Sequence, residues 1–264
     1  MRPEPSLLTR SLPCALLLLL PLTAVAETMT SEQIVDRMVA AHGGLEAWAS
    51  APTVHFEDKF SSPGRDGAKP TRVTVEQGPR RAYMDVVGTD MSMGWDGEKA
   101  WGVNWKVPAP PRFFALLNYY FLDLPWMTQD PGVVLGDPGT GKLPGSDTEY
   151  LVVRMSFESG VGDSPGDYYD LYIDPESFEL AGTRYIVTYK AVLPEGMTAT
   201  PPHTLVYDSW EEVSGLKVPT HYTVYMDGGN IYATCTVTGW SFTEPFDEAR
   251  MTPPPDAVVD TSQP

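Results

Sequence analysis

The chain has 264 residues, with 18 basic and 35 acidic side chains and a formal net charge of −17. So large an excess of negative charge repels nucleic-acid phosphates and anionic lipid headgroups, which argues against nucleic acid as a partner and against stable membrane insertion. Hydrophobic residues make up 42% of the chain, enough to build a large core.

The first 26 residues have the organisation of a secretory signal peptide. Arg2 and Arg10 give a basic start, residues 12–22 are an apolar run dominated by leucine, and Ala24-Val25-Ala26 is a small-x-small cleavage pattern. The run is shorter than the about 20 apolar residues that a membrane span needs. We therefore expect cleavage near Ala26 and a soluble product that is periplasmic or secreted. Loss of the signal peptide removes two basic residues and one acidic residue. The remaining chain has 16 basic and 34 acidic residues and a net charge of −18.

A helix is expected at the start of the remaining chain. Thr30-Ser31-Glu32-Gln33 has the form of a capping box, and apolar residues then recur at helical spacing, at Ile34, Val35, Met38 and Val39. Gly43-Gly44 interrupts this helix. His42, just before the glycines, is expected to bond the last carbonyl groups of the helix.

From Thr53 onward the apolar period changes to two, which is typical of strands. We expect about eleven strands at hairpin spacing without βαβ alternation, and therefore one antiparallel sheet. Asp96-Gly97 marks a hairpin turn. Residues 27–252 are expected to form a single domain, followed by a Pro-rich, loosely ordered tail at residues 253–264.

The segment from Pro111 to Met127 breaks the strand rhythm because it is too densely apolar for a surface loop. Pro110-Pro111 can begin a helix and Pro125 can end it. Cys235, the last cysteine of the chain, alternates with Ile231, Ala233 and Val237. This spacing predicts a buried, inert thiol rather than a nucleophile.

Three motifs carry a family resemblance: Ala41-His42-Gly43-Gly44-Leu45-Glu46-Ala47-Trp48, Leu171-Tyr172-Ile173-Asp174-Pro175-Glu176-Ser177, and Trp210-Glu211-Glu212-Val213-Ser214-Gly215-Leu216-Lys217-Val218-Pro219. In these the chain resembles exported proteins of the LolA-like (lipoprotein-carrier, lipoprotein-sorting) superfamily, above all uncharacterised members with an N-terminal His-Gly-Gly motif. The resemblance implies a mainly β fold with a few helices: an unclosed, strongly curved antiparallel β-barrel whose helices plug the open side. It also implies an apolar cavity between sheet and helices, which receives acyl chains in the characterised carriers.

Methionine and aromatic residues on the predicted 91–105 hairpin, together with the apolar helix that follows it, could line such a cavity. The same residues also fit a filled core. The candidate ligand-binding residues are Met91, Met93, Trp95, Trp101, Phe113, Phe114, Leu117, Tyr120, Phe121 and Trp126.

Motifs for other chemistry are incomplete. Residues 136–142 match a phosphate-binding loop, but Leu143 stands where Ser or Thr should hold Mg²⁺. No histidine has a second ligand at a zinc spacing, and no G-x-S-x-G is present. We therefore nominate no catalytic residue, no metal ligand and no cofactor.

The leading hypothesis is an exported, non-catalytic protein that binds an apolar ligand, such as lipid or lipoprotein acyl chains, as an envelope carrier. An envelope protein is a further candidate partner. Two alternatives stay open: an exported protein-interaction module with a filled core, and a hydrolase with an unrecognised site. A cavity of about 300 Å³ or more would favour the carrier.

Overall fold

The computed structural model describes residues 29–262, and its centre is one sheet of 14 strands that are all paired antiparallel. This confirms the expected mainly β, antiparallel fold. The expected signal peptide lies outside the described residues. The strands are β1 (Thr53–Ser61), β2 (Thr71–Glu76), β3 (Ala82–Val86), β4 (Ser92–Trp95), β5 (Ala100–Val103), β6 (Val133–Leu135), β7 (Gly139–Gly141), β8 (Tyr150–Phe157), β9 (Tyr169–Ile173), β10 (Leu180–Tyr185), β11 (His203–Val213), β12 (Leu216–Met226), β13 (Ile231–Ser241) and β14 (Val258–Val259).

Three of these strands, β6, β7 and β14, exceed the eleven that the sequence predicts. β7 falls in the segment that matches a phosphate-binding loop, and it pairs with β8. β14 falls in the expected loosely ordered tail, where it pairs with β5 and the Asp260 N–H bonds the Ala100 carbonyl at 2.8 Å. Each is only two or three residues long, too short to show an alternating pattern.

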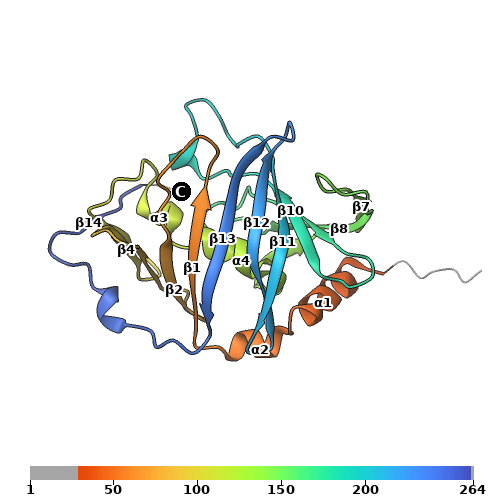
Figure 1. Ribbon diagram of the computed structural model, residues 1–264, viewed down its shortest axis with the longest axis horizontal. Helices are drawn as coiled ribbons and strands as arrows, with labels where there is room; N and C mark the ends of the chain where they lie inside the picture. The colour runs from red at the N-terminus through yellow and green to blue at the C-terminus, as the bar shows by residue number, and fades with distance from the viewer. Residues whose placement is uncertain (1–28, 263–264) are drawn as a thin grey trace, which may run out of the picture.

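The order of the strands dictates where the helices must lie. The sheet runs β14-β5-β4-β3-β2-β1-β13-β12-β11-β10-β9-β8-β6, and the described residues do not join its two ends by hydrogen bonds. The connection from β5 to β6 therefore has to cross from one end of the sheet to the other. It carries α3 (Pro111–Phe114) and α4 (Leu117–Met127), and α4 passes behind the central strands (Figure 1). The expected plug over an open barrel is thus a consequence of strand order.

The sheet owes part of its curvature to β-bulges. The register shifts between residues 55 and 57 of the β1–β13 pair, between 207 and 210 of the β11–β12 pair, and between 224 and 225 of the β12–β13 pair. A bulge adds one residue to one strand, which bends the strand and increases its twist. The central strands therefore wrap around the side that α4 covers.

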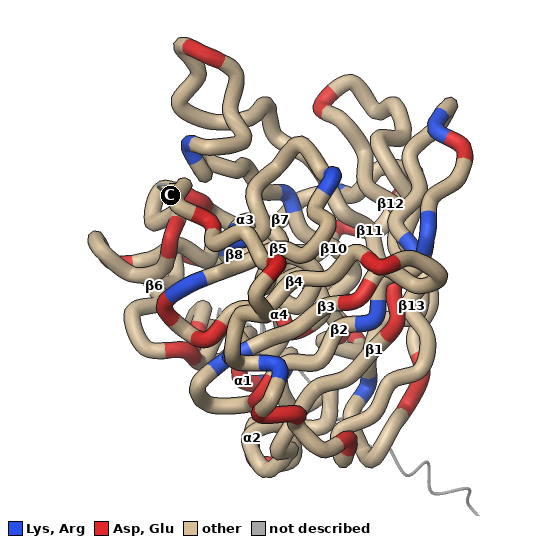
Figure 2. The backbone as a smooth tube through the Cα atoms, turned by 90° about the vertical axis from the view of Figure 1, so that its left-hand side faces the viewer, with Lys and Arg blue, Asp and Glu red and all other residues tan. Residues whose placement is uncertain are grey.

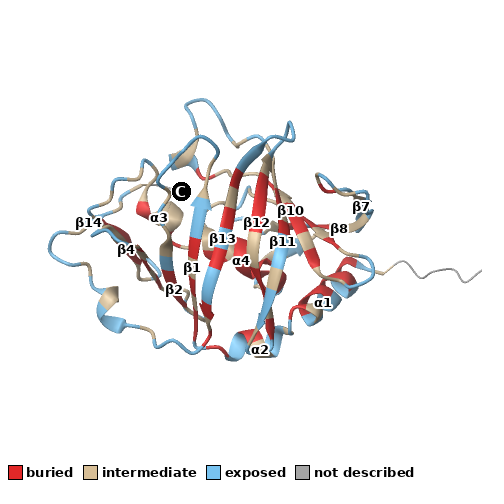
Figure 3. Cartoon of the chain, viewed as in Figure 1, coloured by how far each residue is buried: buried red, intermediate tan, exposed pale blue. Residues whose placement is uncertain are grey.

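Pro125 does not end the apolar helix, contrary to the sequence prediction, because α4 continues to Met127. A proline inside a helix lacks the N–H that would bond the carbonyl four residues earlier, which is that of Phe121. Here the Tyr207 hydroxyl donates a hydrogen bond to the Phe121 carbonyl instead. A side chain of the sheet thus replaces the missing helix bond. The helix is buried over most of its length (Figure 3).

The inward-facing residues of the sheet form one apolar cluster with α4 and with α1 (Ser31–Ala41). The predicted capping box is present at Thr30 and Gln33. Cys235 is 1% exposed, as its alternation predicts, whereas Ile231 at the start of the same strand is 46% exposed. None of the helices in residues 29–262 is both long and apolar enough to cross a membrane.

The His42 side chain joins three parts of the chain. The sequence predicts that its imidazole bonds the last carbonyl groups of its own helix, and this is wrong, because both ring nitrogens bond other segments. The side chain is fully buried, its Nδ1–H donates to the Lys217 carbonyl at 3.0 Å, and its Nε2 accepts from the Leu180 N–H at 3.0 Å. The next residue, Gly43, has φ +99° and lies so close to Gly215 that an added Cβ would be 2.2 Å from its carbonyl oxygen. Only glycine fits this approach.

A second buried polar contact ties α4 to the sheet. Asp58 of β1 is 2% exposed, and it accepts hydrogen bonds from the Thr71 hydroxyl and from the Asn118 amide at the start of α4. Burial raises the pKa of this carboxyl to about 6, from an ordinary 3.8. Burial likewise lowers the pKa of His42 to about 4, from 6.5. The two residues therefore respond to acid in opposite directions.

Asp58 should stabilise the protein more at low pH than at neutral pH. The folded state binds its proton more tightly, so the contribution is fully present below pH 3.8 and is lost as the pH rises through 6. One unit of pKa shift corresponds to about 1.4 kcal/mol. When the pH is lowered from 7 to 4, the free energy of unfolding of wild type should therefore rise by about 2 kcal/mol relative to that of Asp58→Asn. Urea unfolding at both pH values measures this difference. Asp66→Asn, an exposed carboxyl, is the control, and equal pH dependence in all three proteins would contradict the prediction.

His42 should stabilise the protein only while it is neutral. Its folded pKa lies below the unfolded value, so the contribution is present above pH 6.5 and is lost as the pH falls through 4. We expect His42→Ala to lower the free energy of unfolding at pH 7 by about 2–5 kcal/mol, because it leaves a buried N–H and a buried carbonyl unpaired. The loss relative to wild type should shrink by about 3 kcal/mol at pH 4. A loss that does not depend on pH would show that His42 is not held neutral.

Candidate functional site

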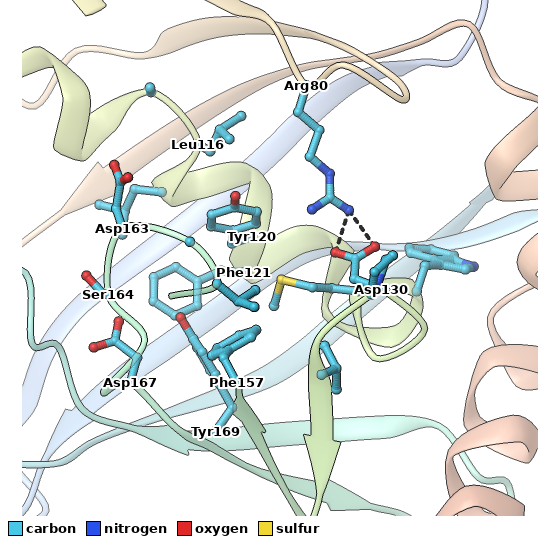
Figure 4. Close-up of a pocket in the computed structure, with 18 of the residues that line it drawn as sticks. Arg80, Leu116, Tyr120, Phe121, Asp130, Phe157, Asp163, Ser164, Asp167 and Tyr169 are labelled. Atoms are coloured by element: carbon cyan, nitrogen blue, oxygen red, sulfur yellow. Dashed lines mark hydrogen bonds and ion pairs between the residues drawn. The ribbon is translucent and has the colours of Figure 1, made fainter. Parts of the chain in front are cut away.

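A cavity of about 660 Å³ lies beside α4 and is partly open to solvent. Its walls come from α2 (Leu45–Ser50), the β2–β3 turn, α3 and α4, the segment after α4, and the loop between β8 and β9 (Figure 4). Aromatic and aliphatic side chains make up most of the lining: Leu45, Trp48, Trp95, Phe113, Leu116, Leu117, Tyr120, Phe121, Trp126, Met127, Val133, Phe157, Val161, Tyr169, Val187 and Tyr189.

Six of the ten candidate ligand-binding residues line this cavity: Trp95, Phe113, Leu117, Tyr120, Phe121 and Trp126. Trp126 stacks on Trp48 with ring centroids 4.1 Å apart and planes 2° apart. Trp48 belongs to the His-Gly-Gly motif, and Trp126 lies 6.0 Å from the His42 ring. The cavity wall therefore continues directly into the buried His42 contact.

The other four candidates lie elsewhere. Met93 is in the core, 2% exposed, and Met91 is partly exposed before β4. Phe114 packs on Trp105 at 5.6 Å and does not line the cavity. Trp101 pairs with Gly94, and opposed residues of two strands point to the same face, so it lies on the opposite face from Met93.

The length of the hairpin turn explains why Trp101 does not line the cavity as the sequence predicts. Trp95 pairs with Ala100, so the turn has four residues, 96–99. With a turn of four residues, an odd-numbered residue of β4 pairs with an even-numbered residue of β5. Met93 therefore pairs with Gly102, and Trp101 cannot share its face of the sheet. The Trp101 ring instead covers Gly94, where an added Cβ would be 2.3 Å from it.

Charged groups that the sequence interpretation did not nominate also line the cavity. Arg80 pairs with Asp130, with Nη2 2.6 Å from Oδ2, and Arg112 pairs with Asp163, with Nε 2.6 Å from Oδ2. Asp167 accepts from the N–H and hydroxyl of Thr188, at 2.6 and 2.7 Å. These residues come from loops and short helices that only the tertiary fold brings together. No local pattern of the sequence could have grouped them.

Two polar side chains beside the cavity lack hydrogen-bond partners within the described part of the chain, residues 29–262. Both carboxyl oxygens of Asp123 are buried and unbonded, and so is the Nε1 of Trp126. Burial raises the pKa of Asp123 well above its ordinary value, which favours the protonated form of this carboxyl. A protonated carboxyl is far easier to bury than a carboxylate.

A shallow groove on the outer face of β11, β12 and β13 is lined by His221, whose ring pairs with the carboxylate of Asp208. His221 Nδ1–H donates to Asp208 Oδ1 at 2.6 Å, and Ser209 lies in the same groove. The Ser209 hydroxyl accepts from Thr220 at 2.7 Å. Among the hydrogen bonds of residues 29–262 there is none from Ser209 to His221, which a serine nucleophile and its base would make. Residues 29–262 also contain no group of three or more His, Cys, Asp or Glu residues placed to hold a metal ion.

Comparison with known proteins supports the fold. No protein-family model matches the chain, and no match is found among curated proteins. Among solved structures, a LolA superfamily protein from Nitrosomonas europaea is similar with a TM-score of 0.54 and 8% identity, over 85% of this chain and 98% of that one. A DUF1329 family protein from Desulfovibrio piger has a TM-score of 0.51 and 9% identity over the same shares. The chain thus has the LolA-like fold that its motifs predict.

A side chain at a cavity wall should contribute less to stability than one that is packed on all sides. Phe121 is 8% exposed and lines the cavity, whereas Phe56 is 0% exposed in the core. We expect Phe56→Ala to lower the free energy of unfolding by about 4 kcal/mol and Phe121→Ala by about 2 kcal/mol, because fewer contacts are lost at the cavity. Urea unfolding of both variants measures this. Equal losses would show that the space beside Phe121 is filled in solution.

Proposed function

We propose that this protein is an exported, non-catalytic binding protein that holds an apolar ligand, a lipid or the acyl chains of a lipoprotein, between the curved sheet and α4. The observation that carries the proposal is the cavity of about 660 Å³. This volume falls within the about 300–1,000 Å³ typical of small-molecule sites, which are mostly apolar with a few polar groups. A protein that only docks other proteins has no need of such a space.

The proposed ligand contacts are the lining residues that the sequence already nominates: Trp95, Phe113, Leu117, Tyr120, Phe121 and Trp126. Rigid aromatic rings give an acyl chain a large contact area with little loss of side-chain entropy. The expected signal peptide would place the protein in the periplasm or outside the cell. An envelope lipid or lipoprotein is therefore the source of ligand that we favour.

Two neighbouring phenylalanines provide a matched test of the site. Phe113 lines the cavity and Phe114 does not, although both are half-buried in the same helix. We expect the neutral fluorescent probe N-phenyl-1-naphthylamine to bind wild type and Phe114→Ala alike. It should bind Phe113→Ala about tenfold more weakly, because one aromatic contact is lost. Fluorescence titration measures the three dissociation constants.

Organic extraction and mass spectrometry of protein purified without detergent should identify copurifying lipid. A wild-type protein that binds no probe and carries no lipid would contradict the proposal and favour an interaction module. Equal probe binding by the two phenylalanine variants would show that any ligand sits elsewhere.

A further inference from the structure

The positive charges on the cavity wall are all matched by neighbouring carboxylates. Within residues 29–262, the basic side chains of the lining are Arg80 and Arg112. Against these two stand three lining carboxyl groups, those of Asp130, Asp163 and Asp167. Figure 4 shows Arg80 and Asp130 at one side of the pocket, and Asp163, Ser164 and Asp167 at another.

The guanidinium group of Arg80 is contacted at its edge by a carboxylate and at its face by two tyrosine rings. Its Nη2 lies 2.6 Å from one oxygen of Asp130 and 2.8 Å from the other. Its guanidinium carbon lies 5.9 Å from the ring centres of Tyr119 and Tyr120. These contacts fix the guanidinium and neutralise its charge at the cavity.

Arg112 is held in the same way at the other end of the cavity. Its Nε and Nη2 bond both oxygens of Asp163, at 2.6 and 2.8 Å, which is the strong bidentate geometry. Its guanidinium carbon lies 5.1 Å from the Trp95 ring centre. Asp260 approaches it as well and accepts from its backbone N–H at 2.8 Å.

Asp167 adds a carboxyl group that forms no ion pair with any arginine of residues 29–262. Its oxygen accepts from Thr188, and burial raises its pKa, so it is harder to ionise than an exposed aspartate. A second anion close to this carboxyl would meet repulsion in a partly dehydrated space. The uncharged hydroxyl groups of Tyr120, Ser164 and Tyr169 in the same wall can donate to an ester or alcohol oxygen.

We infer that the cavity selects lipids whose polar end is uncharged and disfavours those that end in a carboxylate or phosphate. This inference rests on the proposed function, because it concerns the ligand of the same cavity. An anionic headgroup entering the cavity loses water and finds no unmatched cation, which leaves a dehydration cost without compensation. An alcohol or ester needs only a hydrogen bond.

Two ligands that differ only at the polar end test the inference. Dodecanol and dodecanoate share one chain, and each can be titrated against N-phenyl-1-naphthylamine bound to the full protein at pH 8. Dodecanoate is kept below its micelle concentration and dodecanol below its solubility limit. We expect dodecanol to displace the probe at a concentration at least tenfold lower than dodecanoate. A ratio of one or less would overturn the inference.

A variant that frees one arginine should weaken this preference. Asp163→Asn leaves Arg112 without its carboxylate, so the affinity ratio should shift at least fivefold toward dodecanoate. The matched control is Asp85→Asn, because Asp85 pairs bidentately with Arg250, which lies 4.5 Å from the Tyr83 ring, outside the cavity lining. The control should leave the ratio as in wild type. Because a ratio is compared, general damage to the cavity cancels.

The outcomes separate the inference from the proposed function. Tight dodecanoate binding by wild type leaves the proposed function standing and overturns the charge selection alone. An unchanged ratio in Asp163→Asn also overturns it, and Asp130→Asn repeats the test at Arg80 if Asp163→Asn does not fold. If neither ligand nor the probe binds, the proposed function fails, and the inference fails with it.

Discussion

The two hydrogen bonds of His42 determine how the helices sit against the sheet. They connect the end of α1 to the start of β10 and the start of β12, segments that are 138 and 175 residues away in the chain. Lys217, whose carbonyl accepts from His42, also pairs through its ammonium group with Glu179. The first and third of the motifs that carry the family resemblance meet at this point, and Leu180 pairs with Ile173 of the second. Their meaning is therefore structural: they place α2 and its Trp48 at the cavity wall.

Chemistry and periodicity in the sequence were sufficient to predict the main elements of the fold. The capping box, the alternation around Cys235 and the dense apolar run after Pro111 all correspond to what is observed. The failures have a common physical cause. Pro125 continues its helix because Tyr207, 82 positions further along the chain, supplies a bond to the Phe121 carbonyl. His42 bonds two strands and not its own helix for a similar reason, since tertiary partners outweigh local ones.

The site was less predictable than the fold because the cavity lining combines residues from helices, strands and loops. Aromatic density in residues 113–126 pointed to the correct helix, which supplies most of the predicted lining. Trp101 was wrongly included in the predicted lining, because the four-residue hairpin turn places it on the opposite face of the sheet from Met93. The paired arginines and aspartates come from four separate segments. Acidic residues are spread along the chain (Figure 2), so their number gave no hint of which ones face the cavity.

The bond between Tyr207 and the Phe121 carbonyl also limits how the cavity can adapt to its contents. A helix can usually slide along its axis with its backbone bonds intact, because those bonds lie within the helix. Here one carbonyl depends on a hydroxyl of β11, so a shift of α4 would leave a buried acceptor unpaired. Asn118, about one turn earlier in α4, adds a second tie to the sheet through Asp58. These two bonds hold the inner wall of the cavity in place, so any change in the shape of the cavity would have to come from the loops that carry Asp130 and Asp163.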